Sequence, residues 1–159
     1  MPSAAIVAAL IERGFTIAVA ESLTGGMLVS DLIATPGASA AVLGGVVAYD
    51  TRLKHSVLGV DEDLLAEAGA VDPRVAEQMA DRVRGVLAVG GRPADVGVST
   101  TGVAGPDRQD GKDVGTVFLG FALGDRVFSV EVKLSGSREA IRSATVTEAL
   151  LQLQRMLEG

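Results

Sequence analysis

The chain has 159 residues, of which 48% are hydrophobic, 21% are charged and 3% are aromatic, and its formal net charge is −6. This composition is typical of a single soluble domain over residues 1–159, and it excludes intrinsic disorder as the main state. No nucleic-acid partner is expected, because phosphates attract clustered Lys and Arg and single strands need aromatic rings for stacking.

Hydrophobic periodicity and turn residues predict helices and strands that alternate along the chain. Helices are expected over residues 3–13, 27–34, 50–58, 61–68, 73–89 and 137–157, and strands over residues 15–20, 42–49, 96–101, 114–123 and 126–134. The last two strands should form a hairpin at Gly124-Asp125. Early alternation followed by a hairpin favours an α/β fold of three layers, α/β/α, with a mixed, partly parallel sheet of about five or six strands.

The sequence contains no cysteine and a single histidine, His55. Disulfides, thiolate nucleophiles and cysteine-based zinc sites are therefore excluded, and one imidazole is too few for most transition-metal centres. We expect no metal and no cofactor. The apolar N-terminal stretch is interrupted by Glu12 and Arg13, well short of the roughly 20 residues of a membrane span. A cytoplasmic protein with no membrane partner is the expectation.

The turn at residues 21–26, with the sequence ESLTGG, lies between a predicted buried strand and a predicted helix. One interpretation is a plain turn in which Thr24 is the helix N-cap. The other is an anion site, in which Gly25 and Gly26 let a bound phosphate approach the free N–H groups of the helix start. Both interpretations stay open from the residues alone.

Ser39, Tyr49 and Lys54 form a second candidate group. A serine becomes a nucleophile when a base removes its proton, and a lysine can be that base if burial lowers its pKa. A nearby tyrosine hydroxyl could relay the proton. From the residues alone, a purely structural interpretation is favoured, in which Ser39 caps a turn and Lys54 lies on a solvated helix face.

Two further segments could bind a ligand. Thr101, Gly102 and Gly105 lie at or after the carboxyl end of a predicted strand, where ligands of open α/β sheets bind. The alternative is a plain strand end with a Gly-Pro turn. Arg138 and Arg142 lie one turn apart on the last predicted helix. They could hold a phosphate or a carboxylate together, or form surface ion pairs.

Taken in order, several short segments resemble the motifs of one family. They are Glu21-Ser22-x-Thr24-Gly25-Gly26, Gly37-x-Ser39-Ala40, Val47-x-Tyr49 followed by Lys54, Gly59-Val60, Gly69-Ala70-Val71, Gly102-x-Ala104-Gly105-Pro106, Val114-Gly115-Thr116-Val117 and Gly136-x-Arg138. Their order resembles that of the CinA carboxy-terminal domain family, from about Phe15 to Leu157. The order is specific to the family, although no single motif is.

The resemblance implies a nicotinamide-nucleotide amidohydrolase, which converts nicotinamide mononucleotide and water to nicotinate mononucleotide and ammonia in pyridine-nucleotide salvage. It implies Ser39 as the nucleophile with Tyr49 and Lys54 as its helpers, while Ser22 is the competing serine. The expected substrate-binding residues are Ser22, Thr24, Gly25, Gly26, Thr101, Gly102, Gly105 and Arg138. A homodimer or a higher homo-oligomer is implied as well.

The chain departs from the family pattern at three places. Leu23 replaces a common cysteine, Asp107-Arg108 replaces the usual glycines, and Asp113 replaces the usual proline. The last two departures lie in a polar loop and bear on substrate affinity more than on chemistry. Two alternatives therefore stay open: a nucleotide-binding or regulatory module whose activity has decayed, and an amidase for another small amide.

Overall fold

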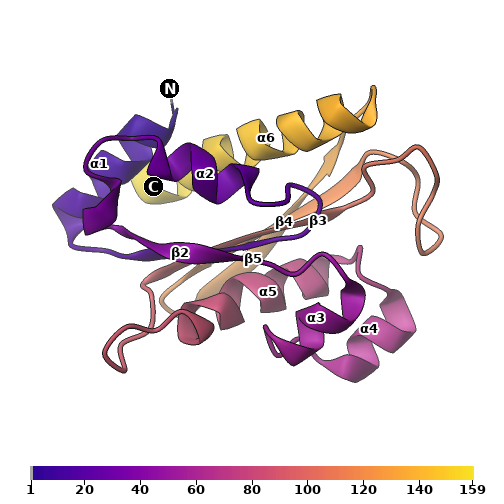
Figure 1. The fold of residues 1–159 in the computed structure, drawn as a ribbon, viewed down its shortest axis with the longest axis horizontal. Coiled ribbons are helices and arrows are strands. Elements are labelled where there is room, and N and C mark those ends of the chain that lie inside the picture. The colour runs from indigo at the N-terminus through magenta and orange to yellow at the C-terminus, as the bar shows by residue number, and fades with distance from the viewer. Residues whose placement is uncertain (1) are drawn as a thin grey trace.

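The computed structural model describes residues 2–159 as a sheet between two layers of helices (Figure 1). The helices are α1 (Pro2–Arg13), α2 (Met27–Ile33), the short 3-10 helix η1 (Ala38–Ala40), α3 (Thr51–Ser56), α4 (Glu62–Ala68), α5 (Pro73–Val86) and α6 (Arg138–Glu158). The strands are β1 (Ile17–Glu21), β2 (Val42–Val47), β3 (Val96–Gly102), β4 (Thr116–Leu123) and β5 (Arg126–Lys133). The predicted elements are confirmed, with ends that differ by a few residues.

The sheet has five strands in the order β2-β1-β3-β4-β5. β1 is parallel to both β2 and β3, whereas β4 is antiparallel to β3 and forms the predicted hairpin with β5. This arrangement confirms the mixed, partly parallel sheet of the expected three-layer fold. Because β1, β2 and β3 run in the same direction, the chain leaves all three strands at the same edge of the sheet.

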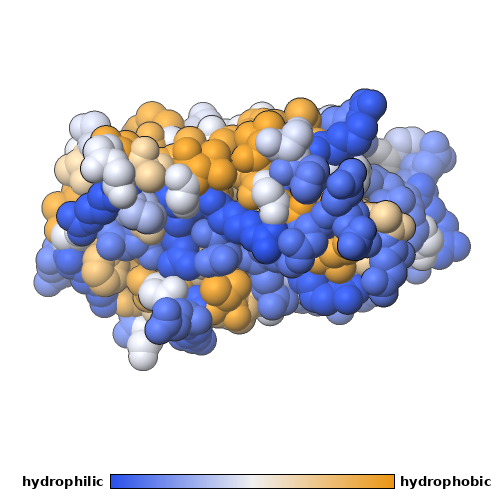
Figure 2. Space-filling model, turned by 90° about the horizontal axis from the view of Figure 1, so that it is seen from below, coloured by the Kyte–Doolittle hydropathy of each residue, from blue (hydrophilic) through white to orange (hydrophobic). Residues whose placement is uncertain are grey.

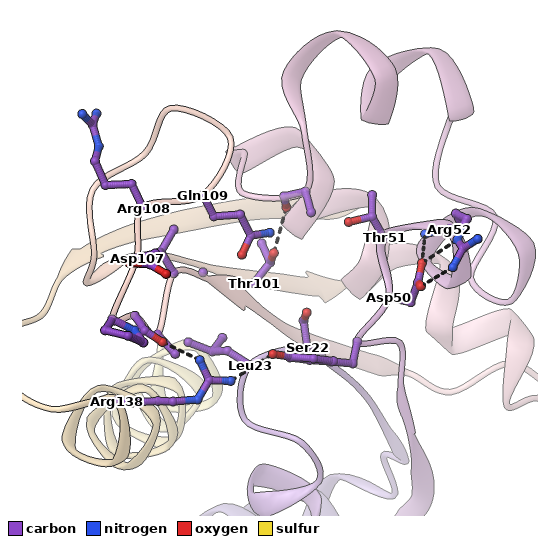
Figure 3. A pocket seen from close by; sticks show the side chains of 17 residues that line it. Ser22, Leu23, Asp50, Thr51, Arg52, Thr101, Asp107, Arg108, Gln109 and Arg138 are labelled. Carbon is purple, nitrogen blue, oxygen red and sulfur yellow. Dashed lines mark hydrogen bonds and ion pairs between the residues drawn. The ribbon is translucent and has the colours of Figure 1, made fainter.

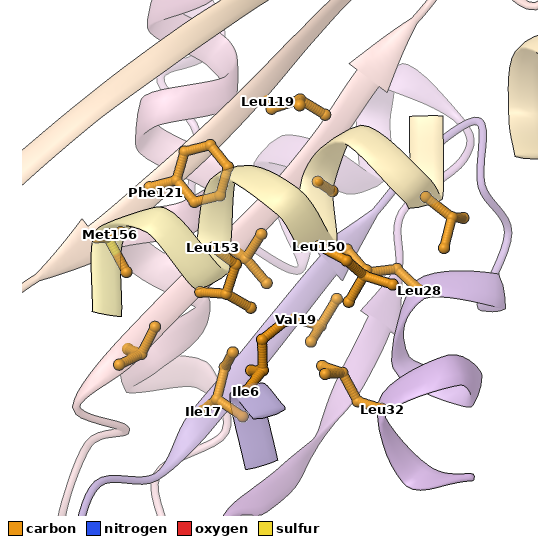
Figure 4. Close-up of a cluster of buried hydrophobic side chains, with 14 of the residues drawn as sticks. Ile6, Ile17, Val19, Leu28, Leu32, Leu119, Phe121, Leu150, Leu153 and Met156 are labelled. Carbon is orange, nitrogen blue, oxygen red and sulfur yellow. The ribbon is translucent and has the colours of Figure 1, made fainter. Parts of the chain in front are cut away.

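The larger hydrophobic core lies between the sheet and the layer formed by α1, α2 and α6 (Figures 1 and 4). Ile6, Leu28 and Leu153 are fully buried there and lie over Val19 and Leu119 of the sheet. Burial of each such aliphatic side chain stabilises the fold by about 1.5–3 kcal/mol. This core fixes the strand that leads into the turn at residues 21–26.

The second face of the sheet is covered by α3, α4 and α5. Here α5 lies directly on the strands: a Cβ atom at Gly97 would be 1.9 Å from the carbonyl oxygen of Ala80, and one at Gly120 would be 2.1 Å from that of Ala76. Only glycine permits this approach, which also lets Ser99 Oγ donate to Ala76 O at 2.6 Å. β3 is thereby held firmly from this side.

The outer surface of this helical layer is largely hydrophilic, with apolar groups more frequent towards the upper margin of the view (Figure 2). Exposed apolar side chains include Val47 at the end of the edge strand β2, and Leu53 and Val57 in and after α3. Within residues 2–159, no helix is long and apolar enough to cross a membrane. The homo-oligomer expected from the resemblance stays a prediction.

Candidate functional site

A cavity of about 750 Å³ lies at the edge of the sheet where β1 and β3 end (Figure 3). Its walls come from the turn after β1, from residues 49–52 after β2, from Ala70, from residues 101–109 at the end of β3 and beyond it, and from the first residue of α6. Since parallel strands all end at this edge, segments that are distant in sequence meet here, as in other open α/β sheets. Ser22 points into the cavity (Figure 3).

Beneath Ser22 lies Lys54, a buried lysine whose side chain is only 1% exposed. Its Nζ donates to Ser22 Oγ at 2.8 Å and to the carbonyl oxygens of Ala48 at 2.7 Å and Tyr49 at 3.4 Å. Among the described residues, no carboxylate forms an ion pair with this amine. The alternative of a solvated helix face for Lys54 is therefore wrong.

Burial lowers the pKa of Lys54 to about 8, although the negative charges of Asp50 and Asp110 act in the opposite direction. At neutral pH, roughly one molecule in ten then carries a neutral amine at this position, which is enough for a general base. A neutral Nζ has a lone pair that can accept the proton of the Ser22 hydroxyl. The pair has the geometry of an activated serine nucleophile.

Ser39 lies at the opposite end of the strands from the cavity, where β2 begins. It belongs to η1, which precedes β2, whereas Tyr49 and Lys54 follow β2. The six residues of β2 separate the two ends by about 20 Å, because a strand rises about 3.3 Å per residue. Ser39 is exposed and lines a separate pocket with Ile33, residues 35–38 and Val42. The structure therefore does not bring Ser39 to Lys54 as the resemblance implied.

The turn at residues 21–26 differs from both of its interpretations. Thr24 is not the N-cap of α2, which is Gly26, and its side chain is fully buried. The carboxylate of Glu21 accepts the N–H groups of Leu28 at 2.9 Å and Val29 at 3.0 Å. This internal carboxylate takes the place that the anion interpretation gave to a bound phosphate.

Three predicted binding residues of this turn, Thr24, Gly25 and Gly26, do not line the cavity. Thr101 does line it, but its hydroxyl is engaged, donating to Ala70 O at 2.8 Å. Gly102 and Gly105 are part of the lining as expected.

Arg138 lines the cavity at the start of α6. Its guanidinium donates to Gly105 O at 2.6 Å and to the Tyr49 hydroxyl at 2.9 Å (Figure 3). The other two arginines of the lining have carboxylate partners: Arg52 pairs with Asp50 at 2.7 Å, and Arg108 pairs with Asp113 at 3.0 Å. Of the cavity-lining cations in residues 2–159, only Arg138 has no ion-pair partner.

Tyr49 lies at the rim with 60% of its surface exposed. The partner of its hydroxyl is Arg138, and only its backbone oxygen faces Lys54. The structure thus places Tyr49 beside the cation of the cavity and not between the serine and the lysine.

Arg142 and Glu21 have roles that the sequence did not reveal. Arg142 Nε donates to Leu23 O at 2.7 Å, so it holds the turn from the side of α6 and does not form a clamp with Arg138. Glu21 was visible in the sequence as the charged residue that follows the predicted buried strand and opens the turn before the next predicted helix. That position is a signal for a carboxylate that caps the helix.

Residues 2–157 match the family model of the CinA C-terminal domain. A CinA-like protein of Frankia casuarinae is 49% identical over 150 residues, which are 94% of this chain and 34% of that protein. This chain therefore spans about a third of the length of the curated relatives it matches.

Solved structures show the same fold. A competence-damaged protein (CinA) superfamily protein from Enterobacter cloacae superimposes with a TM-score of 0.92 at 29% identity, covering 98% of this chain and 90% of that one. A competence/damage inducible protein from Agrobacterium tumefaciens gives a TM-score of 0.88 at 32% identity, covering 99% and 94%. The match over nearly all residues and the agreement in fold lead to one conclusion: the chain belongs to the CinA C-terminal domain family.

Proposed function

We propose that this chain is an amidohydrolase in which Ser22 is the nucleophile and Lys54 is the general base. The observation that carries the proposal is the 2.8 Å contact between Lys54 Nζ and Ser22 Oγ at the floor of the cavity. Burying an ammonium group without a carboxylate partner destabilises a protein, so a lysine in this position is more readily explained by chemistry than by stability.

The reaction follows the order of proton transfers that a serine–lysine pair allows. Neutral Lys54 takes the hydroxyl proton as Ser22 Oγ attacks the carboxamide carbon of the substrate. The resulting ammonium gives this proton to the departing nitrogen, so that ammonia leaves and an ester to Ser22 remains. Water, deprotonated by the same amine, then cleaves the ester to the carboxylic acid and restores the Ser22 hydroxyl.

The substrate that we propose is nicotinamide mononucleotide, on the strength of the family resemblance. Arg138 supports an anionic substrate, because its guanidinium lies in the cavity wall without a carboxylate partner. The net charge of −6 opposes a phosphate only weakly, since charges are screened beyond about 8 Å at physiological salt. A local cation therefore decides where the phosphate binds. A cytoplasmic location and a homo-oligomeric state belong to this proposal.

The proposal is tested by incubating the protein with nicotinamide mononucleotide and measuring released ammonia and nicotinate mononucleotide. Parallel incubations with nicotinamide and with other small amides examine the alternative of a different amide substrate. Binding of the mononucleotide without ammonia release would instead support the decayed binding module.

Activity should rise with pH around the pKa of Lys54, which burial lowers to about 8. The neutral amine is the reactive form, so kcat/KM should increase about tenfold per pH unit below this value and level off above it. A profile of kcat/KM between about pH 6 and pH 10 at constant ionic strength measures this. A rate that is flat or falls across that range would contradict Lys54 as the base.

Replacing Arg138 with alanine should raise KM for nicotinamide mononucleotide by about 10- to 100-fold with a smaller effect on kcat, because a charge-assisted phosphate contact is lost. Arg155→Ala, which removes an exposed arginine near the other end of α6, is the matched control. Nicotinamide riboside lacks the phosphate, so its kcat/KM should be similar with and without Arg138. An equal loss for both substrates would exclude Arg138 as the phosphate contact.

A further inference from the structure

A chain of buried hydrogen bonds runs from Glu21 to the backbone of Ser22 through two threonines. Thr24 Oγ1 lies 2.5 Å from Glu21 Oε1 and 2.8 Å from Thr100 Oγ1, and the N–H of Ser22 lies 3.3 Å from Thr100 Oγ1. The side chains of Glu21, Thr24 and Thr100 are completely shielded from solvent. None of the three takes part in the proton transfers proposed above.

The direction of these hydrogen bonds follows from which of the groups can donate a hydrogen. All three groups that contact the Glu21 side chain can donate, so its carboxylate acts as the acceptor and the Thr24 hydroxyl gives it a hydrogen. Thr24 Oγ1 can then only accept, so the hydroxyl of Thr100 must donate to it. Thr100 Oγ1 in turn accepts the N–H of Ser22. Each bond polarises the next in the same sense, which strengthens a chain of this kind in a buried setting.

We infer that Glu21, Thr24 and Thr100 are positioning residues, which hold the backbone of Ser22 so that its Oγ stays within reach of Lys54. The inference rests on the proposed function and adds residues that act through Ser22 without touching substrate. Ser22 is anchored twice to β3, because its N–H also donates to Thr100 O at 3.1 Å. Glu21 joins this anchor to α2 by accepting two of its N–H groups.

The turn is also held from its other side, where Arg142 donates to the carbonyl oxygen of Leu23. Leu23 is thus fixed by α6 while Ser22 is fixed by β3. The turn contains two consecutive glycines, Gly25 and Gly26, whose backbones are freer than those of other residues. Without side-chain anchors, such a segment would sample other positions of the Ser22 hydroxyl, and displacement by about 1 Å can cost 100-fold in rate.

The test compares Thr100→Val, which replaces the hydroxyl with a methyl group of similar size, with Thr100→Ser, which keeps the hydroxyl. Ser99→Ala is the matched control, because Ser99 is the neighbouring buried residue of β3 and its hydroxyl bonds to α5 on the opposite face of the sheet. Two quantities are measured for each variant: amide hydrogen exchange at Ser22, Leu28 and Val29 in the free protein, and kcat and KM for ammonia release.

Thr100→Val should speed exchange at these amides by about fivefold or more, the equivalent of one lost hydrogen bond. It should lower kcat by about 10- to 100-fold and leave KM within about threefold. Thr100→Ser should keep the exchange rates and kcat close to those of the wild-type protein. Ser99→Ala should change neither, apart from the effect of a general loss of stability. A merely structural hydroxyl would not give this split between kcat and KM.

Wild-type exchange rates in Thr100→Val, or a kcat no lower than that of Ser99→Ala, would overturn the inference. If the wild-type protein releases no ammonia, the proposed function fails. The exchange rates alone then decide whether the hydrogen bonds through Thr24 and Thr100 hold Ser22. Faster exchange at all three amides in Thr100→Val would then support it, and unchanged exchange would overturn it.

Discussion

Ser22→Ala should lower kcat for ammonia release by about a thousandfold or more, whereas Ser39→Ala should leave it within about twofold. The first variant removes the atom that attacks the amide, and loss of a serine nucleophile typically has effects of this size. The second removes an exposed hydroxyl that precedes β2, at the end of the strands away from the cavity. Both are measured in one assay at saturating substrate.

The two alanine variants control each other, since each removes one hydroxyl. Thermal unfolding of both should show that Ser22→Ala remains folded, because Lys54 Nζ keeps its carbonyl acceptor on Ala48. Near-normal turnover by Ser22→Ala together with loss of activity in Ser39→Ala would return the nucleophile to Ser39 and contradict the geometry described above.

Lys54→Met should lower kcat by about a thousandfold as well, because methionine is similar in length but has no amine to accept the serine proton. The double variant Ser22→Ala with Lys54→Met should be only slightly slower than either single variant, since two residues that act as one unit do not have additive effects. The measurement is a double-mutant cycle on kcat.

Lys133→Met is the matched control for this change. Lys133 lies on β5 with an exposed side chain that pairs with Glu131, so its replacement should leave kcat unchanged. Multiplicative losses in the double variant would mean that Ser22 and Lys54 act independently, and the proposed pair would then be wrong.

The sequence predicted the fold well because local patterns specify its elements. The apolar run at residues 15–20, the long amphipathic segment that became α5, and the Gly124-Asp125 turn each indicate one structure without tertiary information. The three-layer arrangement then follows from the order of strands and helices, since consecutive parallel strands need a crossover between them.

The pairing of site residues was harder to predict, because it depends on the order of the strands. Lys54 lies 15 positions after Ser39 but 32 positions after Ser22. The family resemblance pointed to Ser39, and the spacing along the chain gave no reason to prefer Ser22. In the folded protein β1 and β2 are parallel neighbours, with Glu21 opposite Val47, so the segments that follow these two residues meet. Only the sheet register shows that Ser22 is the serine beside the lysine.

Burial was equally invisible in the sequence. α3 is short, and nothing in its composition marks Lys54 as buried while Arg52, two residues earlier, remains exposed and paired with Asp50. The difference arises because the Lys54 side chain reaches under the turn at residues 21–26, where Ser22 and the carbonyl groups after β2 replace water as its partners. These partners come from segments far apart in the chain.

Trapping of the acyl group tests the proposed mechanism most directly. Hydroxylamine added at substrate concentrations below KM competes with water for an ester on Ser22. We predict that a hydroxamate forms at the expense of nicotinate mononucleotide, while the total rate of amide consumption stays constant, because acylation precedes the partition. Ser22→Ala should form neither product. A total rate that rises in proportion to hydroxylamine, or the absence of any hydroxamate from an active enzyme, would contradict a covalent intermediate and with it the role proposed for Ser22.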